Sequence, residues 1–91
     1  MDTKHARGAV SEMIASAKLM REGWHVFSNV ASNGLIDIVA VNPETGETKF
    51  YDVKTKSYRK DGTLIYRIPS KKQKAIGVEI YMIDRVDMEQ L

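Results

Sequence analysis

The stretch from Gly34 to Val41 is an apolar strand pattern interrupted by a single acid. It reads Gly-Leu-Ile-Asp-Ile-Val-Ala-Val, and a second strand pattern, Lys-Phe-Tyr-Asp-Val-Lys-Thr-Lys, covers residues 49–56. A nearly continuous apolar run is typical of a strand that is covered on both faces of a sheet. Asp37 lies inside this run, and a buried carboxylate requires a partner. The sequence therefore predicts a sheet organised around these two strands, with a polar site at Asp37.

The second strand pattern carries an acid and a lysine two residues apart. Side chains alternate between the faces of a strand, so Asp52 and Lys54 share one face. The intervening run, Asn-Pro-Glu-Thr-Gly-Glu-Thr at residues 42–48, favours a hairpin reversal. Such a reversal can bring Asp37 beside Asp52. Two carboxylates next to an ammonium group form a hard-oxygen site suited to Mg²⁺ or Mn²⁺, with a lysine able to position or deprotonate a water.

The remaining patterns predict one α/β domain over residues 1–91, with a central mixed sheet flanked by helices. Gly23 is expected to end the first helix, and Ser70 and Gln73 form a capping-box pattern at the start of the second. The predicted order is helix, three strands, helix, strand, with the elements at residues 6–22, 24–28, 34–41, 49–56, 70–77 and 78–84. Residues 64–68 are expected to be a short extended segment, and residues 85–91 a short appendage.

The first predicted helix has two stripes at helical spacing. One is apolar (Val10, Met13, Ile14, Ala17 and Met20), and the other combines Gly8, Glu12, Ala15 and Leu19. We expect one stripe to pack on the sheet and the other, on the side of Met13, Ala17 and Met20, to meet a second subunit. Position alone favours a surface role for Glu12, because glutamate is rarely buried without a partner.

Length and composition restrict the class of protein. A chain of 91 residues buries only about 60–65% of its unfolded surface, so dimerisation would add stability. The absence of cysteine excludes a disulfide framework and a thiolate metal site. No signal peptide is visible, and no apolar run approaches the roughly 18 residues of a membrane span. We therefore expect a soluble, intracellular, cytoplasmic protein that is not bound to a membrane.

Basic residues are concentrated in one part of the chain. Residues 54–74 contain eight basic residues and one acid, a net charge of +7, whereas the rest of the chain has six basic and eleven acidic residues, a net charge of −5. Such a run is often only a solvated surface. Its position directly after Asp52 and Lys54 favours contact with a nucleic-acid backbone.

These motifs resemble the PD-(D/E)xK nuclease superfamily. Asp37, preceded by Ile36, corresponds to the Pro-Asp element with a departure at Ile36, and Asp52-Val53-Lys54 corresponds to the (D/E)xK element. The closest similarity is to archaeal-type Holliday-junction resolvases and small phage-like relatives. It covers about residues 7–57 and rests on the order of Arg7-Gly8, Glu12, Ala15, Leu19, Gly23-Trp24-His25-Val26, Gly34, Asp37 and Asp52-Val53-Lys54.

The resemblance implies a restriction-endonuclease-like αβββαβ core and a Mg²⁺-dependent endonuclease, with Mn²⁺ able to substitute. It assigns metal binding to Asp37, Asp52 and the carbonyl of Val53. Glu12 would complete the site directly or through water, and Lys54 would orient or activate the attacking water. Gln73 resembles a residue that approaches the active site from the following helix, although the capping role competes with this interpretation. The expected product has a 5′-phosphate and a 3′-hydroxyl.

The resemblance to junction resolvases implies a DNA substrate, namely the Holliday junction or another branched DNA. Paired incisions in two strands require two sites, so we expect a homodimer. The alternatives are a nicking, homing or restriction-type endonuclease of the same fold, and a non-catalytic nucleic-acid-binding module whose acids are structural. The residues expected to contact DNA are Arg7, Lys56, Ser57, Arg59, Lys60, Arg67, Lys71 and Lys72.

Overall fold

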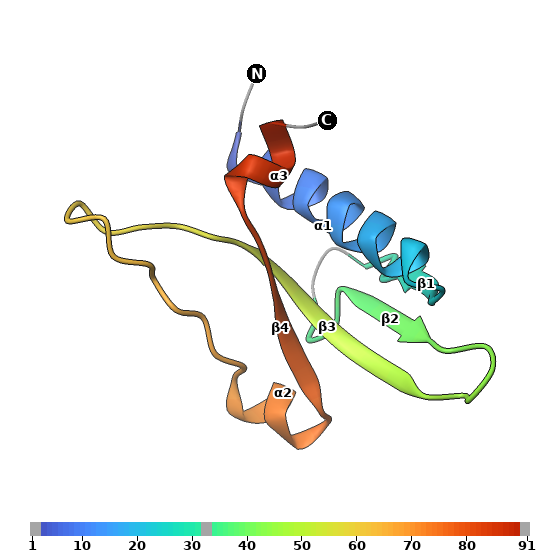
Figure 1. The fold of residues 1–91 in the computed structure, drawn as a ribbon. Helices are drawn as coiled ribbons and strands as arrows, with labels where there is room; N and C mark the ends of the chain where they lie inside the picture. Colours follow the sequence, from blue (N-terminus) through green and yellow to red (C-terminus); the bar gives the residue numbers. More distant parts are fainter. Residues whose placement is uncertain (1–2, 32–33, 90–91) are drawn as a thin grey trace.

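The protein has an α/β fold with a four-stranded mixed sheet, as expected (Figure 1). The computed structural model describes residues 3–31 and 34–89. The order of helix, three strands, helix and strand is confirmed, and one further helix follows. The elements are α1 (Lys4–Arg21), β1 (His25–Ser28), β2 (Ile38–Val41), β3 (Thr48–Thr55), α2 (Lys71–Ala75), β4 (Val78–Ile83) and α3 (Arg85–Glu89).

The strands lie in the order β1-β2-β3-β4. The first three are antiparallel neighbours, whereas β4 pairs parallel to β3. The predicted hairpin reversal between β2 and β3 is confirmed: the N–H of Asn42 donates to the carbonyl of Glu47 at 2.8 Å, and the N–H of Gly46 donates to that of Asn42 at 2.8 Å. Gly46 has a φ of 77°, a conformation that glycine adopts readily. The reversal fixes the register in which Ile38 pairs with Tyr51.

Helix α1 covers one face of the sheet (Figure 1). It starts at Lys4, earlier than predicted, because the hydroxyl of Thr3 accepts a hydrogen bond from the N–H of Ala6 at 3.1 Å and caps the helix. Gly23, with a φ of 96°, follows the last turn as expected. Together with three strands, α1 encloses a core of Ile14, Ala15, Leu19, Ile38, Ala40, Val53 and Ile83.

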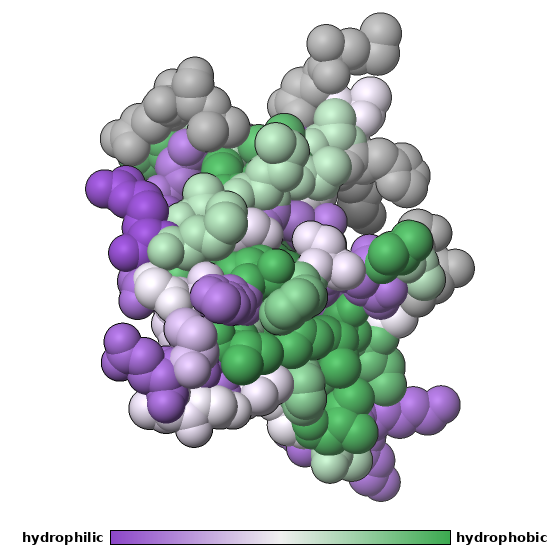
Figure 2. All heavy atoms as spheres, turned by 90° about the vertical axis from the view of Figure 1, so that its right-hand side faces the viewer, coloured by the Kyte–Doolittle hydropathy of each residue, from purple (hydrophilic) through white to green (hydrophobic). Residues whose placement is uncertain are grey.

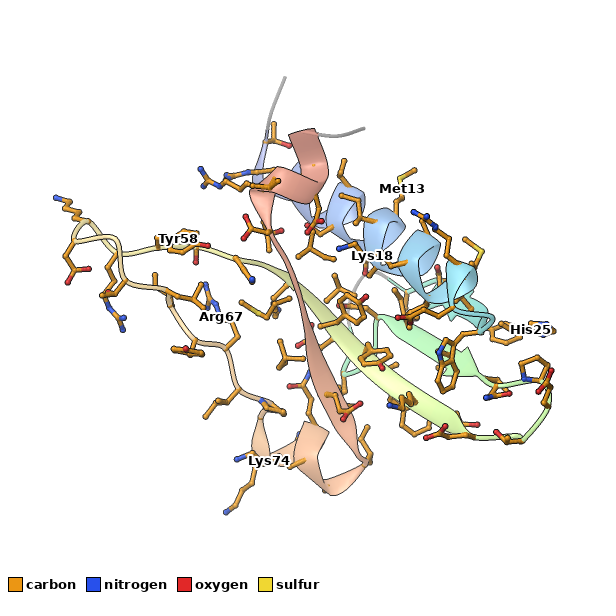
Figure 3. The ribbon with its side chains drawn as sticks, in the orientation of Figure 1. Met13, Lys18, His25, Tyr58, Arg67 and Lys74 are labelled. Carbon is orange, nitrogen blue, oxygen red and sulfur yellow. The ribbon has the colours of Figure 1, made fainter. Side chains whose placement is uncertain are left out.

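The two stripes predicted on α1 do not divide as expected. The buried residues are Ser11, Ile14, Ala15 and Leu19, and they combine members of both stripes. Ser11 is tolerated there because its hydroxyl lies 2.6 Å from that of Thr55 on β3. Met13 and Met20 are 70% and 57% exposed, and Figure 3 shows Met13 pointing away from the sheet. The side of α1 expected to meet another subunit is thus exposed in the single chain.

The predicted strand at residues 34–41 is too long. Only Ile38–Val41 is a strand, and Asp37 lies directly before it. The expected cover on both faces is also wrong: Ile38 and Ala40 are buried, but Val39 and Val41 are only half-buried. The reason is that α2, a helix of five residues, packs beside β4 and does not extend over β2.

Two segments lie outside the sheet: the chain between β3 and α2 and the chain after β4. Residues 64–68 form no strand, and their only pairing among the described residues is an isolated bridge between Leu64 and Tyr58. Residues 85–89 are helical, and α3 lies beside α1, where Lys18 Nζ is 2.9 Å from Asp87 Oδ1. Across the described ranges, no helix has both the length and the apolar character needed to cross a membrane.

Candidate metal site and basic pocket

Asp37 and Asp52 lie opposite each other at the start of β2. Ile38 pairs with Tyr51, so one step back along β2 places Asp37 against Asp52. The N–H of Asp37 donates to the carbonyl of Tyr51 at 2.8 Å, which ties the residue before β2 to β3. Both aspartates point to the face of the sheet that α1 leaves uncovered, because alternation directs Ile38 and Tyr51 toward α1. The predicted contact between the two carboxylates is therefore present.

Asp37 is held by the backbone of β3. Its Oδ2 accepts a hydrogen bond from the N–H of Val53 at 2.8 Å. The N–H and C=O of a strand residue point toward the same neighbour, so the carbonyl of Val53 is directed to the side of β3 on which Asp37 lies. The carbonyl that the resemblance assigns to metal binding thus faces the region of the two carboxylates.

The environment of Asp37 favours its protonated form. Burial removes water from the carboxylate and raises its pKa from 3.8 to about 6. The hydrogen bond from Val53 opposes this shift, whereas the hydrogen bond and negative charge of Asp52 and the negative charge of Glu12 add to the increase. A half-buried carboxylate beside a second carboxylate is stabilised in its charged form by a cation. Asp37 is therefore the side chain of this site that would gain most from a bound metal ion.

Asp52 is fixed on both of its oxygens. Gln73 Nε2 on α2 donates to Oδ2 at 2.9 Å, and Lys54 Nζ lies 3.5 Å from Oδ1. The side chain of Asp52 is only 13% exposed, whereas that of Lys54 is 46% exposed. The carboxylate is therefore positioned from within the protein, and the ammonium group extends toward solvent beside it.

Gln73 makes both of the contacts that the sequence suggested for it: it takes part in the capping box of α2, and it reaches Asp52. Its Oε1 accepts from the N–H of Ser70 at 2.9 Å, and the Ser70 hydroxyl accepts from the N–H of Gln73 at 3.2 Å, so the predicted capping box is confirmed. Its Nε2 donates to Asp52 and to the carbonyl of Leu35 at 3.0 Å. The side chain amide is buried and connects the start of α2 to the carboxylate pair.

Glu12 lies near this site without joining it. Its charge acts on Asp37, but within residues 3–31 and 34–89 no three His, Cys, Asp or Glu side chains converge closely enough to hold one metal ion together. The geometry therefore does not support direct binding of the metal by Glu12. A contact of Glu12 with the metal through a water molecule is the alternative that is left. The chemistry of the remaining donors fits a hard cation: Asp37, Asp52 and the carbonyl of Val53 would hold it.

Six of the predicted site residues gather in a pocket next to the carboxylates: Arg7, Val53, Lys54, Lys56, Ser57 and Arg67. The pocket has a volume of about 360 Å³ and lies between the start of α1, the end of β3, the segment that leads to α2 and the start of α3. Figure 3 shows Arg67 on that segment, facing β3. Its polar and charged lining comprises Arg7, Lys54, Thr55, Lys56, Ser57, Arg67 and Arg85.

The other four residues expected to contact DNA lie outside the pocket. Arg59 and Lys60 are exposed in the turn after β3, and Lys71 and Lys72 are exposed on α2. The sequence did not predict two contributors. Arg85 lies outside the basic run and enters the pocket through the parallel strand β4, and the carbonyl of Leu35 is a backbone group with no sequence signal.

Comparison with known proteins adds no relative. No protein-family model, no curated protein and no solved structure matches this chain. Any function must therefore be inferred from the arrangement of the described residues and from the motif that they form.

Proposed function

We propose that this protein is a metal-dependent DNA endonuclease with a PD-(D/E)xK-type site on a restriction-endonuclease-like core. One observation carries the proposal: Asp37 and Asp52 meet at the start of β2, on the same face as Lys54. The hydrogen bond from Gln73 to Asp52 and the raised pKa of Asp37 support it. Buried carboxylates that are held together despite their repulsion are typical of functional sites.

Each residue of the site has its own role in the proposed reaction. A bound Mg²⁺, or Mn²⁺ in its place, supplies charge neutralisation at the scissile phosphate and leaving oxygen. Asp37, Asp52 and the Val53 carbonyl would hold it, and Gln73 and the Val53 N–H keep the two carboxylates in position. The side chain of Lys54 would orient or activate the attacking water. Hydrolysis would leave a 5′-phosphate and a 3′-hydroxyl.

The proposed substrate is branched DNA, in particular the four-way Holliday junction. The basic residues after β3 support a nucleic-acid backbone as the partner, and the resemblance to junction resolvases supports the branched form. A homodimer would supply two sites for paired incisions. A nicking, homing or restriction-type endonuclease would use the same core with a different substrate.

A non-catalytic nucleic-acid-binding module is the second candidate. The observation that favours it is the lack, among the described residues, of a third carboxylate converging with Asp37 and Asp52. In such a module the two aspartates would serve only to hold the start of β2 and the start of α2 in place. The two functions differ in one respect that can be measured, which is metal-dependent cleavage.

The deciding experiment incubates the purified protein with a four-way junction, a matched duplex and a single strand, in Mg²⁺ or in EDTA. Asp52→Asn is the control variant, since it removes one charge and almost no volume. We expect Mg²⁺-dependent cleavage of the junction, and a loss of more than about a hundredfold in Asp52→Asn with junction binding intact. Binding without cleavage would identify a binding module, and cleavage of all three DNAs a general nuclease. Full activity of Asp52→Asn would refute the site.

A further inference from the structure

The pocket beside the carboxylate pair has the charge of an anion site. Its described lining carries three guanidinium and two ammonium groups and no carboxylate: Arg7, Lys54, Lys56, Arg67 and Arg85. These residues come from four separate parts of the chain, and Arg7 and Arg85 lie outside the basic run of residues 54–74. A basic run in one segment is often only a solvated surface, but convergence of cations from four segments on one cavity is not explained by local sequence.

Acids lie near both ammonium groups of the pocket. Lys54 Nζ lies 3.5 Å from Asp52, and Lys56 Nζ lies 3.7 Å from Asp84 Oδ2, a separation that leaves both ammonium groups with hydrogen-bonding capacity. Arg67 and Arg85 are exposed, so their guanidinium groups are accessible to a ligand. Guanidinium groups match the oxygens of a phosphate with two parallel donors.

Ser57 supplies an independent indication of a polar ligand. Its Oγ is buried, lines the pocket through its residue, and has no hydrogen-bond partner in the described part of the chain. A buried hydroxyl without a partner costs free energy, so such groups normally bind a water or a ligand. Rotation of this side chain toward the pocket would allow a phosphate oxygen to accept the hydrogen bond from its hydroxyl.

We propose that the pocket binds a phosphate group of the nucleic acid, next to the phosphate that is cut. Lys54 belongs to both sites, and Lys56 lies two residues farther along the chain, just past the end of β3, about 7 Å away at the rise of an extended chain. The pocket therefore fixes the position along the nucleic-acid strand at which the carboxylates act. Its relation to cleavage rests on the proposed nuclease function, whereas its affinity for phosphate does not. The phosphate is either an internal diester or a terminal monoester of the strand.

The first test measures phosphate binding without metal. The protein is titrated with inorganic phosphate in EDTA, and the backbone amide signals of Lys56 and Ser57 are followed by NMR. We expect saturable shifts, and about tenfold weaker binding in Arg67→Gln and in Arg85→Gln, since each removes a charged hydrogen bond. Arg21→Gln, at the far end of α1, is the matched control and should bind as the wild type does. Absence of saturation, or an equal effect of Arg21→Gln, would overturn the proposal.

The second test identifies the kind of phosphate. Two short single-stranded oligonucleotides that differ only in a 5′-phosphate or a 5′-hydroxyl are bound in EDTA. A preference of about tenfold for the 5′-phosphate, lost in Arg67→Gln and Arg85→Gln, identifies a terminal monoester. Equal binding of both, weakened about tenfold by either variant, identifies an internal diester. Unchanged binding of both oligonucleotides in both variants refutes a nucleic-acid phosphate as the ligand.

Cleavage assays in Mg²⁺ separate this proposal from the nuclease function. If phosphate binds as expected but no DNA is cut, the pocket remains and the nuclease function is wrong. If DNA is cut and Arg67→Gln and Arg85→Gln cut it at the wild-type rate and position, the pocket has no part in the reaction and the proposal is wrong.

Discussion

Gln73 Nε2 lies 2.9 Å from Asp52 Oδ2, a contact between residues 21 positions apart in the sequence. The same side chain caps α2 through its Oε1, so its two ends have different tasks. One end stabilises the helix that presents it, and the other orients a carboxylate of the proposed site. A substitution at Ser70 can separate these tasks, because it alters the cap and leaves the contact between Gln73 and Asp52 in place.

Gln73→Glu and Gln73→Leu should both slow cleavage by about ten- to hundredfold, because each removes the donor to Asp52. Both should also lower the thermal midpoint, since Gln73→Leu removes the acceptor for the Ser70 N–H and Gln73→Glu places a second buried carboxylate against Asp52. Ser70→Ala is the matched control: it removes the other half of the cap, costs about 1 kcal/mol of stability and leaves the donor in place. Cleavage that falls equally in Ser70→Ala would mean that Gln73 acts only through the helix.

Lys54→Ala should abolish turnover while Mg²⁺ still binds, because an ammonium group is not a metal ligand. Lys49→Ala is the matched control. Lys49 is on the same strand but on the opposite face, where its Nζ lies 5.7 Å from the ring centre of Trp24. Single-turnover rates and calorimetric Mg²⁺ titrations of both variants check the prediction. Loss of Mg²⁺ binding in Lys54→Ala would contradict the role assigned to the lysine.

Asp37→Asn should stabilise the metal-free protein above pH 6. The pKa of Asp37 is about 6 in the folded chain and 3.8 for the unperturbed group, so the folded state favours the proton. The stability due to protonated Asp37 is complete below 3.8 and is lost as pH rises through 6. The asparagine avoids this loss, which amounts to about 1 kcal/mol after allowance for solvent screening.

Thermal unfolding of Asp37→Asn and wild type in EDTA, at pH values from 4 to 8, measures this effect. The difference in stability should be largest above pH 6 and vanish near pH 4. Addition of Mg²⁺ should stabilise the wild type and leave Asp37→Asn unchanged, since the metal binds only the folded site with its charge. A constant difference across the pH range would show that Asp37 does not titrate as proposed.

The sequence predicted the contact at the centre of the site because it depends on local rules. Alternation placed Asp52 and Lys54 on one face, and the turn at residues 42–48 aligned β2 with β3 so that Asp37 met Asp52. The capping box of α2 was also predictable, because it requires only four consecutive residues. The roles assigned to these residues in metal binding and cleavage stay predictions.

Features that depend on packing between distant segments were not predictable. The exposure of the second face of β2 depended on how little of it α2 covers, and the buried side of α1 depended on the contact between the hydroxyls of Ser11 and Thr55. The entry of Arg85 into the pocket depended on the parallel pairing of β4 with β3, which places the end of β4 beside Lys56. No pattern within one segment contains this information.

Neutralising Arg59, Lys60, Lys71 and Lys72 should weaken binding to every DNA shape. All four are exposed outside the pocket, so the folded structure should persist. Each lost phosphate contact should reduce the slope of log affinity against log salt by about 0.9 on duplex DNA. Fluorescence anisotropy between low and moderate salt measures the slope. If the slope of the quadruple glutamine variant equals that of the wild type, these side chains face away from the DNA.

We predict a homodimer that uses the exposed side of α1. Met13 and Met20 are 70% and 57% exposed there, and Phe27 on β1 is 58% exposed. Figure 2 shows hydrophobic side chains gathered on the side of the molecule that carries β1. Large exposed apolar areas are typical of association surfaces. Sedimentation equilibrium at micromolar concentration should give twice the chain mass, and a monomer mass would count against both dimer and resolvase.

Replacement of Met13 and Met20 with glutamate should yield monomers if this face of α1 forms the contact. Arg21→Glu, exposed on the same helix and not part of the apolar stripe, controls for the added negative charge. A dimer that survives in the double variant would place the contact elsewhere, for example at the free edge of β1.

The hydrogen bond from the Val53 amide to Asp37 gives the protein an internal spectroscopic reporter. Just before the start of β2, the carboxylate of Asp37 accepts this proton in place of a main-chain carbonyl. A charged acceptor forms a stronger hydrogen bond than a neutral one, so protonation of Asp37 or capture of its charge by a cation weakens the bond. The resonance and exchange rate of a single amide proton therefore follow the occupancy of the carboxylate pair, in the absence of any substrate.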